Sequence, residues 1–587
     1  SGEFAPIGWD EALDLCAERL LRIRAESGPA AIFHYRSGGS LGLLKHLTDY
    51  FFEKFGPVTV KRGDICSGAG DAAQLADFGD EDAHDLFDML SAKSIVIWGK
   101  NVHVSSPHTL PVLREAKKRG AHLTLVDPVH HQTATICSDY VQPRPAGDFA
   151  VAMAVARVLF ERGWVDPDAA KYCDNLDEFR ALAMSRTADA WCADADISLE
   201  QALSLATRLG PGKPCAIIVG WGMARRKSGG AIVRALDALS AISGNIGIPG
   251  GGVSYYYKRR GAFHLDFVRG KAAAPRTLCE PLFGSEVLAA KDPPVRAVWI
   301  TAGNPVAMLP DSHRTVEALR TREFVVVVDS FLTDTARLAH LVLPTRTLLE
   351  EDDLLGAYGH HYVATARPVI DPPPGVKSDL EIAQALAARV GLAAEMAGTA
   401  REWKERIVAP RLGRHGITVD TLDEKAVRNP LAAKVLYEDR KFKTASGRMN
   451  LMTAAPPAEA VAGAQLDYPL WLMSLSTADS QSSQWTRKPE GPLVVTVHPD
   501  AAEGIADGGF ARLESPIGAL DVRVEYDAKQ RRDVAIVPKG GHLRDGRCPN
   551  VLVRAATTDM GEGAALYDER VRLVPVTGTA VSAASTR

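Results

Sequence analysis

Apolar strand segments, each followed by a polar loop and then a helix, recur along most of the sequence, and this alternation limits the possible folds more than any other feature. The runs 30–35, 94–98 and 122–126 each end in a loop rich in Gly, Asn, Ser, Asp or His. The same pattern starts again with 297–301 and 324–328. Strands that alternate with helices in this way predict parallel, doubly wound sheets. We therefore predict two Rossmann-like α/β modules.

The last part of the chain has a different pattern. From residue 470 onward, short strand segments are separated only by turns, which is typical of a small β-barrel or sandwich. The predicted fold class is α/β, with two doubly wound modules and a C-terminal β-barrel cap. The expected domains are 1–57 with 262–386 as one module, 58–261 as the other, 387–466 as a mixed connecting region, and 467–582 as the barrel.

The loops at the strand ends are the expected ligand-binding edges, because ligands of such sheets bind at the carboxyl ends of the strands. The loops 36–40, 99–103 and 127–131 contain Gly, which allows close approach of the backbone, and Asn or Asp, which suit ribose and base edges. Both modules carry loops of this kind, so the pattern favours two related nucleotide-like ligands. A single ligand, or simple turn chemistry at each loop, remains the alternative.

Cys66 stands where a loop that follows the strand segment 58–60 turns into a helix. Unpaired backbone N–H groups and the helix dipole stabilise a thiolate at a helix N-terminus. A thiolate is a soft ligand, suited to a heavy metal. On this evidence alone, a buried cysteine without a chemical role is the alternative.

The cysteine spacing and the net charge argue against several kinds of binding site and partner. The eight cysteines are scattered and none forms a CxxC pair, so we expect neither a disulfide framework nor a zinc or iron–sulfur site within this chain. The net charge of -4 gives no basic footprint for nucleic acid, and no apolar run is long enough to span a bilayer. A cytoplasmic location is favoured. The chain begins at Ser1 without Met, so we also expect that a longer protein has lost an N-terminal part, together with any export signal.

Short motifs, in this order and spacing, resemble those of the molybdopterin oxidoreductases of the dimethyl sulfoxide reductase family, over nearly the whole chain. They are Trp98-Gly99-Lys100-Asn101, Asp127-Pro128, Arg144-Pro145-Ala146-Gly147-Asp148, the glycine-rich segment 243–252, Gly303-Asn304-Pro305, and Asp329 with 330–336. The segment 474–477 and Asn550 resemble the family's cap domain.

The resemblance implies bis-molybdopterin guanine dinucleotide as cofactor, with Mo or W held by dithiolene sulfurs and one protein side chain. Cys66 stands where that ligand is expected. Its neighbour Ser67 is the alternative, because some members use Ser, but the thiolate is the softer ligand. The implied dinucleotide and pterin contacts are Gly99, Asn101, Asp127, Asp148, Gly220 and Gly222 for one dinucleotide, Gly303, Asn304, Asp329, Thr333 and Thr335 for the other, and Ser474, Ser476, Gln484 and Asn550 for the cap.

Three departures from the family pattern limit what it implies. The cysteine-rich segment that binds a 4Fe-4S cluster in many members is absent here, so such a cluster is expected only from a missing N-terminal segment or a partner. Formate dehydrogenases have His after the metal ligand, where this chain has Ser67. They also carry Arg-Gly-Gln-Asn-Asn after the glycine-rich turn, and 253–261 matches it only at Arg260-Gly261. Formate is therefore possible as a substrate but not favoured.

Arg260 and His361 complete the candidate catalytic set with Cys66. An arginine can bind an anionic substrate, and a histidine can act as acid or base near neutral pH; a solvated arginine and a histidine bonded to backbone are the alternatives. We expect a Mo- or W-dependent oxidoreductase that acts on a small polar or anionic substrate, such as formate or an oxyanion of sulfur or nitrogen. An iron–sulfur or flavin subunit is the expected electron partner. A non-redox hydratase and a metal-free scaffold subunit of a respiratory complex are the alternatives.

Overall fold

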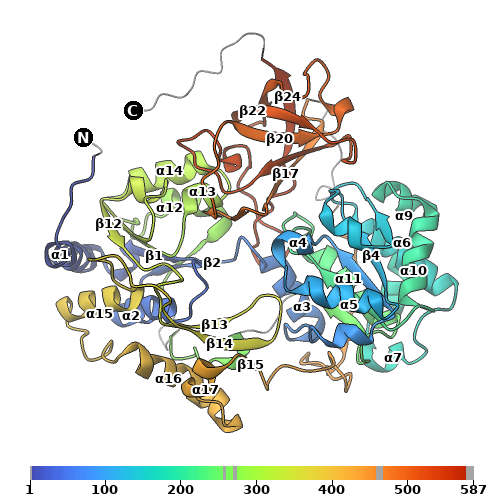
Figure 1. Cartoon of the computed structure of the whole chain (residues 1–587), viewed down its shortest axis with the longest axis horizontal. Helices are drawn as coiled ribbons and strands as arrows, with labels where there is room; N and C mark the ends of the chain where they lie inside the picture. Colours follow the sequence, from blue (N-terminus) through green and yellow to red (C-terminus); the bar gives the residue numbers. More distant parts are fainter. Residues whose placement is uncertain (1–2, 256–259, 269–273, 458–466, 577–587) are drawn as a thin grey trace. The chain divides into compact units, whose positions relative to one another are not determined.

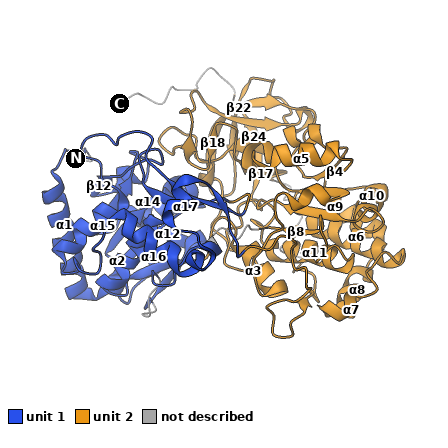
Figure 2. Ribbon diagram, turned by 60° about the horizontal axis from the view of Figure 1, so that its bottom comes forward, with its two compact units in different colours: residues 1–62, 259–357, 361–431 blue, residues 63–258, 358–360, 432–587 orange. Residues whose placement is uncertain are grey.

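The computed structural model in Figure 1 describes residues 3–255, 260–268, 274–457 and 467–576. The chain forms two compact units, coloured separately in Figure 2. Unit 1 contains Ser1–Arg62, Arg259–Ala357 and His361–Leu431, and unit 2 contains Gly63–Lys258, Tyr358–His360 and Ala432–Arg587. Each unit is therefore assembled from segments that are far apart in the sequence.

Unit 1 is built on a six-stranded sheet in the order β12-β11-β10-β1-β2-β9, in which all neighbouring strands are parallel. Its strands are β1 (Ile32–Arg36), β2 (Thr59–Arg62), β9 (Thr277–Cys279), β10 (Ala297–Thr301), β11 (Phe324–Asp329) and β12 (Leu341–Pro344). Strand β10 is buried throughout, as expected for a parallel strand covered on both faces. The predicted parallel arrangement is confirmed here.

Helices cover both faces of this sheet. Helix α15 contacts both α1 and α2, and Figure 1 shows α12 and α14 across strand β1 from α2 and α15. The helices of unit 1 are α1 (Trp9–Ser27), α2 (Leu47–Phe55), α12 (Phe283–Ala289), α13 (Pro305–Met308), α14 (Ser312–Arg320), α15 (Asp379–Arg389), α16 (Ala400–Leu412) and α17 (Val419–Glu424). A small antiparallel sheet of β13 (Asp353–Gly356), β14 (Tyr362–Ala366) and β15 (Val427–Arg428) completes the unit.

Unit 2 contains a second parallel sheet, in the order β5-β4-β3-β7-β8. Its strands are β3 (Ser94–Trp98), β4 (His122–Val126), β5 (Asp139–Val141), β7 (Cys215–Val219) and β8 (Gly252–Ser254). Trp98, at the end of β3, pairs with Val126 on one side and Val219 on the other. The carboxyl ends of these three strands are therefore level, which brings their loops to one edge.

Helices of unit 2 surround this sheet. They are α3 (Gly68–Phe78), α4 (Val102–Ser105), α5 (Thr109–Lys118), α6 (Asp148–Glu161), α7 (Ala169–Tyr172), α8 (Leu176–Met184), α9 (Ala188–Ala195), α10 (Leu199–Leu209) and α11 (Gly229–Ile242). Helix α6 is buried along most of its length and packs against α9, α10 and α11. Helix α3, which follows Cys66, packs against α11. None of the described helices is both long enough and apolar enough to cross a membrane.

The predicted barrel is confirmed as a closed six-stranded barrel in unit 2, with the order β17-β23-β20-β22-β21-β24. Its strands are β17 (Leu470–Leu475), β20 (Leu493–Val497), β21 (Phe510–Glu514), β22 (Ala519–Tyr526), β23 (Val534–Pro538) and β24 (Arg570–Pro575). Strand β24, which the sequence did not predict, pairs with β17 and β21 and so closes the barrel. The alternation of buried and exposed positions along β20 and β22 matches a strand with one face in a core.

Candidate active site

Cys66 lies in the turn between β2 and α3; it is partly exposed and is not in a disulfide. The carboxylate of Asp64 accepts hydrogen bonds from the backbone N–H groups of Cys66 and, at 2.9 Å, of Ser67. Ser67 precedes the first residue of α3, and its hydroxyl donates to Asp71 at 2.7 Å. These bonds fix the backbone of the turn.

A segment near the end of the chain covers this turn. Asp64 forms an isolated β-bridge with Gly563, and its N–H donates to the carbonyl of Glu562 at 3.4 Å. A side-chain carbon placed on Gly561 would lie 2.0 Å from the carbonyl oxygen of Gly68. A side-chain carbon on Gly68 would in turn lie 2.8 Å from the carbonyl oxygen of Gly561. Glycine at both positions therefore serves a backbone contact that the sequence did not predict.

Arg225, which was not selected from the sequence, lies beside Cys66. Its guanidinium donates through Nε to the carbonyl oxygen of Cys66 at 3.0 Å. Lys539 follows strand β23 directly and was not selected either. Burial and Arg225 lower the pKa of Lys539 to about 7, while the charge of Cys66 acts in the opposite direction. The turn therefore contacts one cationic and one anionic side chain, Arg225 and Asp64.

The strand-end loops of unit 2 touch each other. Gly99, at the end of β3, has φ +63, and a side-chain carbon on Gly220 would lie 1.8 Å from the Gly99 carbonyl oxygen. Gly220 also donates its N–H to the Trp98 carbonyl at 2.7 Å. Glycine at both positions is thus required by backbone packing at the edge where the dinucleotide was predicted, and Gly222 follows in the same loop.

The polar residues predicted along this edge are held by neighbours. Asn101 accepts a hydrogen bond from the Thr133 hydroxyl at 3.3 Å. Asp127 accepts from the Val129 N–H at 2.9 Å and lies 3.1 Å from the His131 ring. Asp148 is buried, and its carboxylate accepts from the Trp98 indole N–H at 2.8 Å; burial raises the pKa of Asp148. The structure brings these residues to one edge, and their contacts to a dinucleotide stay predictions.

Lys100 lies in the same loop as Gly99 and was not selected from the sequence, although it stands inside a motif quoted there. Its pKa is lowered to about 8 by burial. Among the residues that the structure describes, no carboxylate forms an ion pair with Lys100. A half-buried ammonium without a protein counter-ion suits the phosphates of a dinucleotide.

Replacing Lys100 with glutamine is expected to weaken cofactor retention about tenfold or more, because a hydrogen bond to a charged group is lost. The measurement is guanine nucleotide and molybdenum released per mole of purified protein. Lys100→Arg keeps the charge and should retain the cofactor. Lys93→Gln removes the charge of an exposed lysine nearby and serves as the matched control. Equal cofactor content in Lys100→Gln and in the unmodified protein would contradict the assignment.

The predicted residues of unit 1 are tied together at the ends of β10 and β11. The Thr335 hydroxyl donates to the side-chain oxygen of Asn304 at 2.7 Å and accepts from the Val306 N–H at 3.1 Å. Asp329 accepts from the Phe331 N–H at 3.0 Å, and burial raises the pKa of Asp329 to about 6. Gly303 and Thr333 lie in the same two loops. This unit therefore presents its own polar edge.

The barrel residues predicted to cap the pterins differ in exposure. Ser474, at the end of β17, is buried, and Asn550 is buried in a single 3-10 turn, Pro549–Val551. Ser476 is half-buried, and Gln484 is exposed at the start of β19 (Gln484–Trp485). Their role as a cap stays a prediction.

Arg260 and His361 belong to unit 1, whereas Cys66 belongs to unit 2. Arg260 begins a short 3-10 helix, Arg260–Ala262, and its side chain lies outside the described residues. His361 is buried, and its carbonyl accepts the Asn429 N–H at 2.8 Å. The catalytic roles of both residues stay predictions.

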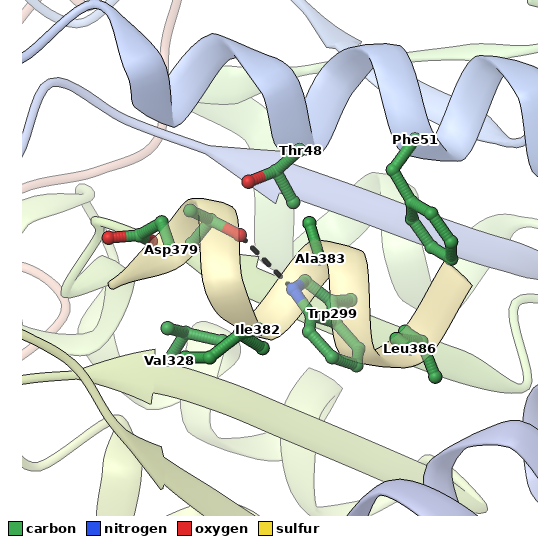
Figure 3. Close-up of a pocket in the computed structure, with 9 residues that line it drawn as sticks. Thr48, Phe51, Trp299, Val328, Asp379, Ile382, Ala383 and Leu386 are labelled. Carbon is green, nitrogen blue, oxygen red and sulfur yellow. Dashed lines mark hydrogen bonds between the residues drawn. The ribbon is translucent and has the colours of Figure 1, made fainter. Parts of the chain in front are cut away.

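Two cavities of unit 1 contain none of the predicted site residues. Figure 3 shows the smaller one, about 10 Å³ in volume, between α2, α15 and the strands β10 and β11. Its lining is mainly apolar, and the Trp299 indole donates to Thr301 at 3.1 Å beside it. A space of this size holds one water molecule at most. The larger cavity, about 280 Å³, is lined by Lys45 and several carboxylates.

The donor groups of the site fit a soft metal carried by an anionic dinucleotide cofactor. Cys66 offers a partly exposed thiol that is not in a disulfide, and a thiolate is a soft metal ligand. Lys100 supplies positive charge. Within the described part of the chain, the side-chain Nδ2 of Asn304 and the hydroxyl of Ser474 are buried with no hydrogen-bond partner. Such orphaned groups at strand ends are what a bound polar ligand would satisfy.

Comparison with protein families agrees with this chemistry. The molybdopterin oxidoreductase family matches residues 1–389, and the molydopterin dinucleotide binding domain matches residues 474–568. The chain belongs to the molybdopterin oxidoreductase family. Its predicted identity as a molybdopterin enzyme, and its bis-molybdopterin guanine dinucleotide cofactor, are thereby confirmed.

Relatives match this molybdopterin oxidoreductase over nearly its full length. The "Probable oxidoreductase YyaE" of Bacillus subtilis (strain 168) is 31% identical, over 97% of this chain and 89% of its own. The biotin sulfoxide reductase of Cereibacter sphaeroides is 25% identical, over 98% of this chain and 90% of its own. Acetylene hydratase from Pelobacter acetylenicus has the same fold, with a TM-score of 0.78 and 18% identity, over 98% of this chain and 90% of that chain. The predicted fold class is therefore confirmed.

Proposed function

We propose that the protein is the catalytic subunit of a molybdenum-dependent oxidoreductase that acts on a small polar or anionic substrate. The observation that carries the proposal is the setting of Cys66. Its thiol is partly exposed and is not in a disulfide, and hydrogen bonds with Asp64 and Arg225 hold its backbone. A thiol on a backbone held in this way stands at a rigid position, which a catalytic metal ligand requires.

The chain's own residues position and charge the site. Asp64 orders the backbone N–H groups of the turn, Arg225 holds the carbonyl of Cys66, and Tyr255 donates its hydroxyl to the Ser67 carbonyl at 3.2 Å. When bound, the cofactor supplies the chemistry of electron acceptance and donation. Cys66 would be the protein ligand of its metal, and the strand-end loops would hold its dinucleotides.

The substrate is proposed to be formate or an oxyanion or oxide of sulfur or nitrogen, with an iron–sulfur or flavin protein as electron partner. The biotin sulfoxide reductase relative supports reduction of an oxide. A hydratase is the second candidate, because acetylene hydratase has the same fold.

Electron exchange with a dye separates the two candidates. We expect metal-loaded protein to oxidise a reduced viologen dye when nitrate, dimethyl sulfoxide or a related oxide is added, or to reduce an oxidised dye with formate. Dye absorbance and product analysis are measured together, and the Cys66→Ala protein is the control. Product formed by addition of water, with the dye unchanged, would contradict the redox proposal and support the hydratase.

A further inference from the structure

The larger cavity of unit 1, about 280 Å³ in volume, gathers charged side chains from several elements. It lies between the 3-10 turn Leu44–His46, the start of β13, and the first turns of α15 and α16. None of the residues predicted to hold the cofactor lines it. Its volume is close to the lower end of the range of small-molecule sites, about 300–1,000 Å³. A small organic molecule can therefore fit inside it.

Five carboxylates line this cavity, and two of them have a cation of their own. The five are Glu351, Asp352, Asp353, Asp379 and Glu381. Asp352 pairs with Lys404 at 2.6 Å, and Glu381 pairs with Arg346 at 2.9 Å. The side chains of Asp352 and Glu381 are 35% and 44% exposed. These two ion pairs therefore form a rim that water reaches.

The other three carboxylates are buried and share a single ammonium. Lys45 lies 2.9 Å from Asp379 and 3.4 Å from Glu351, and the side chains of all three are more than nine-tenths buried. Asp353 is buried too, and it accepts two backbone N–H groups at 2.8 and 2.9 Å. Among the described residues, no other cation forms an ion pair with these carboxylates. When all three are ionised, two buried negative charges lack a counter-ion, which costs free energy.

The pKa values reflect this excess of negative charge. Burial, together with the charges of Asp379 and Asp353, raises the pKa of Glu351 to about 7 against the opposing effect of Lys45. Burial also raises the pKa of Asp353 to about 6. Without a further cation, the cavity thus holds its carboxyl groups partly protonated near neutral pH.

One carboxylate oxygen in the cavity is buried without a hydrogen bond. It is Oδ1 of Asp379, which has no partner in the part of the chain that the structure describes. Figure 3 shows the Asp379 carboxylate directed away from Trp299 and Leu386 of the smaller cavity, and Asp379 also lines the larger one. A buried acceptor of this kind is satisfied by a donor that the protein itself does not supply.

We propose that this cavity binds a small organic cation, a primary ammonium or guanidinium compound. Such a group carries the positive charge that the three buried carboxylates lack. Its N–H groups can donate to Asp379 Oδ1 and to Glu351. The inference is independent of the proposed function, because its residues all belong to unit 1 and none is assigned to the cofactor.

Two other ligand classes fit the cavity less well. Within the described residues, no group of three or more His, Cys, Asp or Glu side chains is arranged to hold a metal ion. An anion would need free N–H groups at the starts of α15 and α16. Both helices already have complete capping boxes, Ser378 with Glu381 and Thr399 with Glu402, which satisfy part of these donors.

Calorimetric titration of cofactor-loaded protein with agmatine tests the proposal, because agmatine carries an ammonium at one end and a guanidinium at the other. Tetramethylammonium, a cation without N–H groups, and inorganic phosphate are the comparison probes. Glu351→Gln removes one buried charge and keeps the side-chain size. We expect this variant to bind agmatine about tenfold more weakly or worse. Glu395→Gln removes an exposed carboxylate of the same unit and is the matched control, with unchanged affinity.

The outcomes separate a built site from general attraction to an acidic surface. Tighter binding of agmatine than of tetramethylammonium, lost in Glu351→Gln alone, supports the proposal. Equal agmatine affinity in Glu351→Gln and in the unmodified protein would overturn it, as would a dissociation constant above about 10 mM or tighter binding of phosphate. If Glu351→Gln does not fold, Asp352→Asn at the rim decides, because it too should weaken agmatine binding. Unchanged affinity in Asp352→Asn would then overturn the proposal.

Discussion

Replacing Cys66 with alanine is expected to lower turnover of the metal-loaded protein by more than about a hundredfold, since even residues that only support a metal ligand cost 10–100-fold when changed. Turnover with a reduced dye and molybdenum content are measured on the same preparation. Cys66→Ser places a harder oxygen ligand at the same position, so its turnover should lie between that of Cys66→Ala and that of the unmodified protein. Cys137→Ala removes another partly exposed free thiol and is the matched control. Unchanged turnover in a molybdenum-loaded Cys66→Ala protein would refute the assignment.

The fold should not change in this variant. Asp64 and Arg225 bind the N–H and carbonyl of Cys66, and alanine keeps both groups. The thiol itself is partly exposed. We therefore expect the free energy of unfolding to change by less than about 1 kcal/mol, which a urea titration can measure. A larger loss would mean that the cysteine has a structural role instead.

The second large effect concerns two buried carboxyl groups between α3 and α11. Asp77 and Asp237 are both fully buried. Asp77 accepts from Arg234 Nε at 2.6 Å, and Asp237 accepts from Gln74 at 3.3 Å. The remaining carboxylate oxygen of each has no partner within the described part of the chain. Burial raises the pKa of both groups, and Asp237 also feels the charge of Asp77.

This pair makes the protein less stable as the pH rises. The unfolded carboxyl groups lose their protons near pH 4, whereas the folded pair still binds a proton well above that pH. Because the native state then holds more protons, the free energy of unfolding falls from about pH 4 towards neutral pH. The stabilising contribution is therefore complete only below the unfolded pKa.

Asp237→Asn should remove this dependence, because an amide donates to Asp77 without titrating. We expect the variant to gain on the order of 2 kcal/mol relative to the unmodified protein between pH 5 and pH 8. Urea unfolding at several pH values is the measurement. Asp77→Asn is the control, since it leaves Arg234 without a carboxylate and should destabilise at every pH by about 3–5 kcal/mol. Parallel pH profiles for Asp237→Asn and the unmodified protein would show that the folded pair binds no proton above the unfolded pKa.

The sequence pattern predicted the two parallel sheets, but it did not predict the strand that closes the C-terminal barrel. Alternating strands and helices identify the two parallel sheets, because each strand end carries its own local turn residues. Strand β24 was missed, since it pairs with segments about 100 residues away in β17 and about 60 residues away in β21, and no local pattern marks it. The expected domain boundaries stay a prediction.

In the candidate site too, the sequence predicted residues that a local pattern marks and missed residues that tertiary packing places. Cys66 is marked locally by the helix that follows it. Arg225 is one of 68 basic residues, and only the fold brings its guanidinium to the carbonyl of Cys66. Lys100 was not selected either, although it stands inside the motif Trp98-Gly99-Lys100-Asn101. Residues placed by tertiary packing alone have no periodicity or spacing from which to predict them.

The cover over the Cys66 turn has a consequence for how the protein is made. Segment 561–563, which contacts Asp64 and Gly68, leaves the ribosome almost five hundred residues after the turn that it covers. Domains fold as they emerge, N-terminal first. Unit 2 contains both the turn and segment 561–563, so it can be completed only after that segment has been made. Until then the turn lacks the segment that covers it in the folded unit.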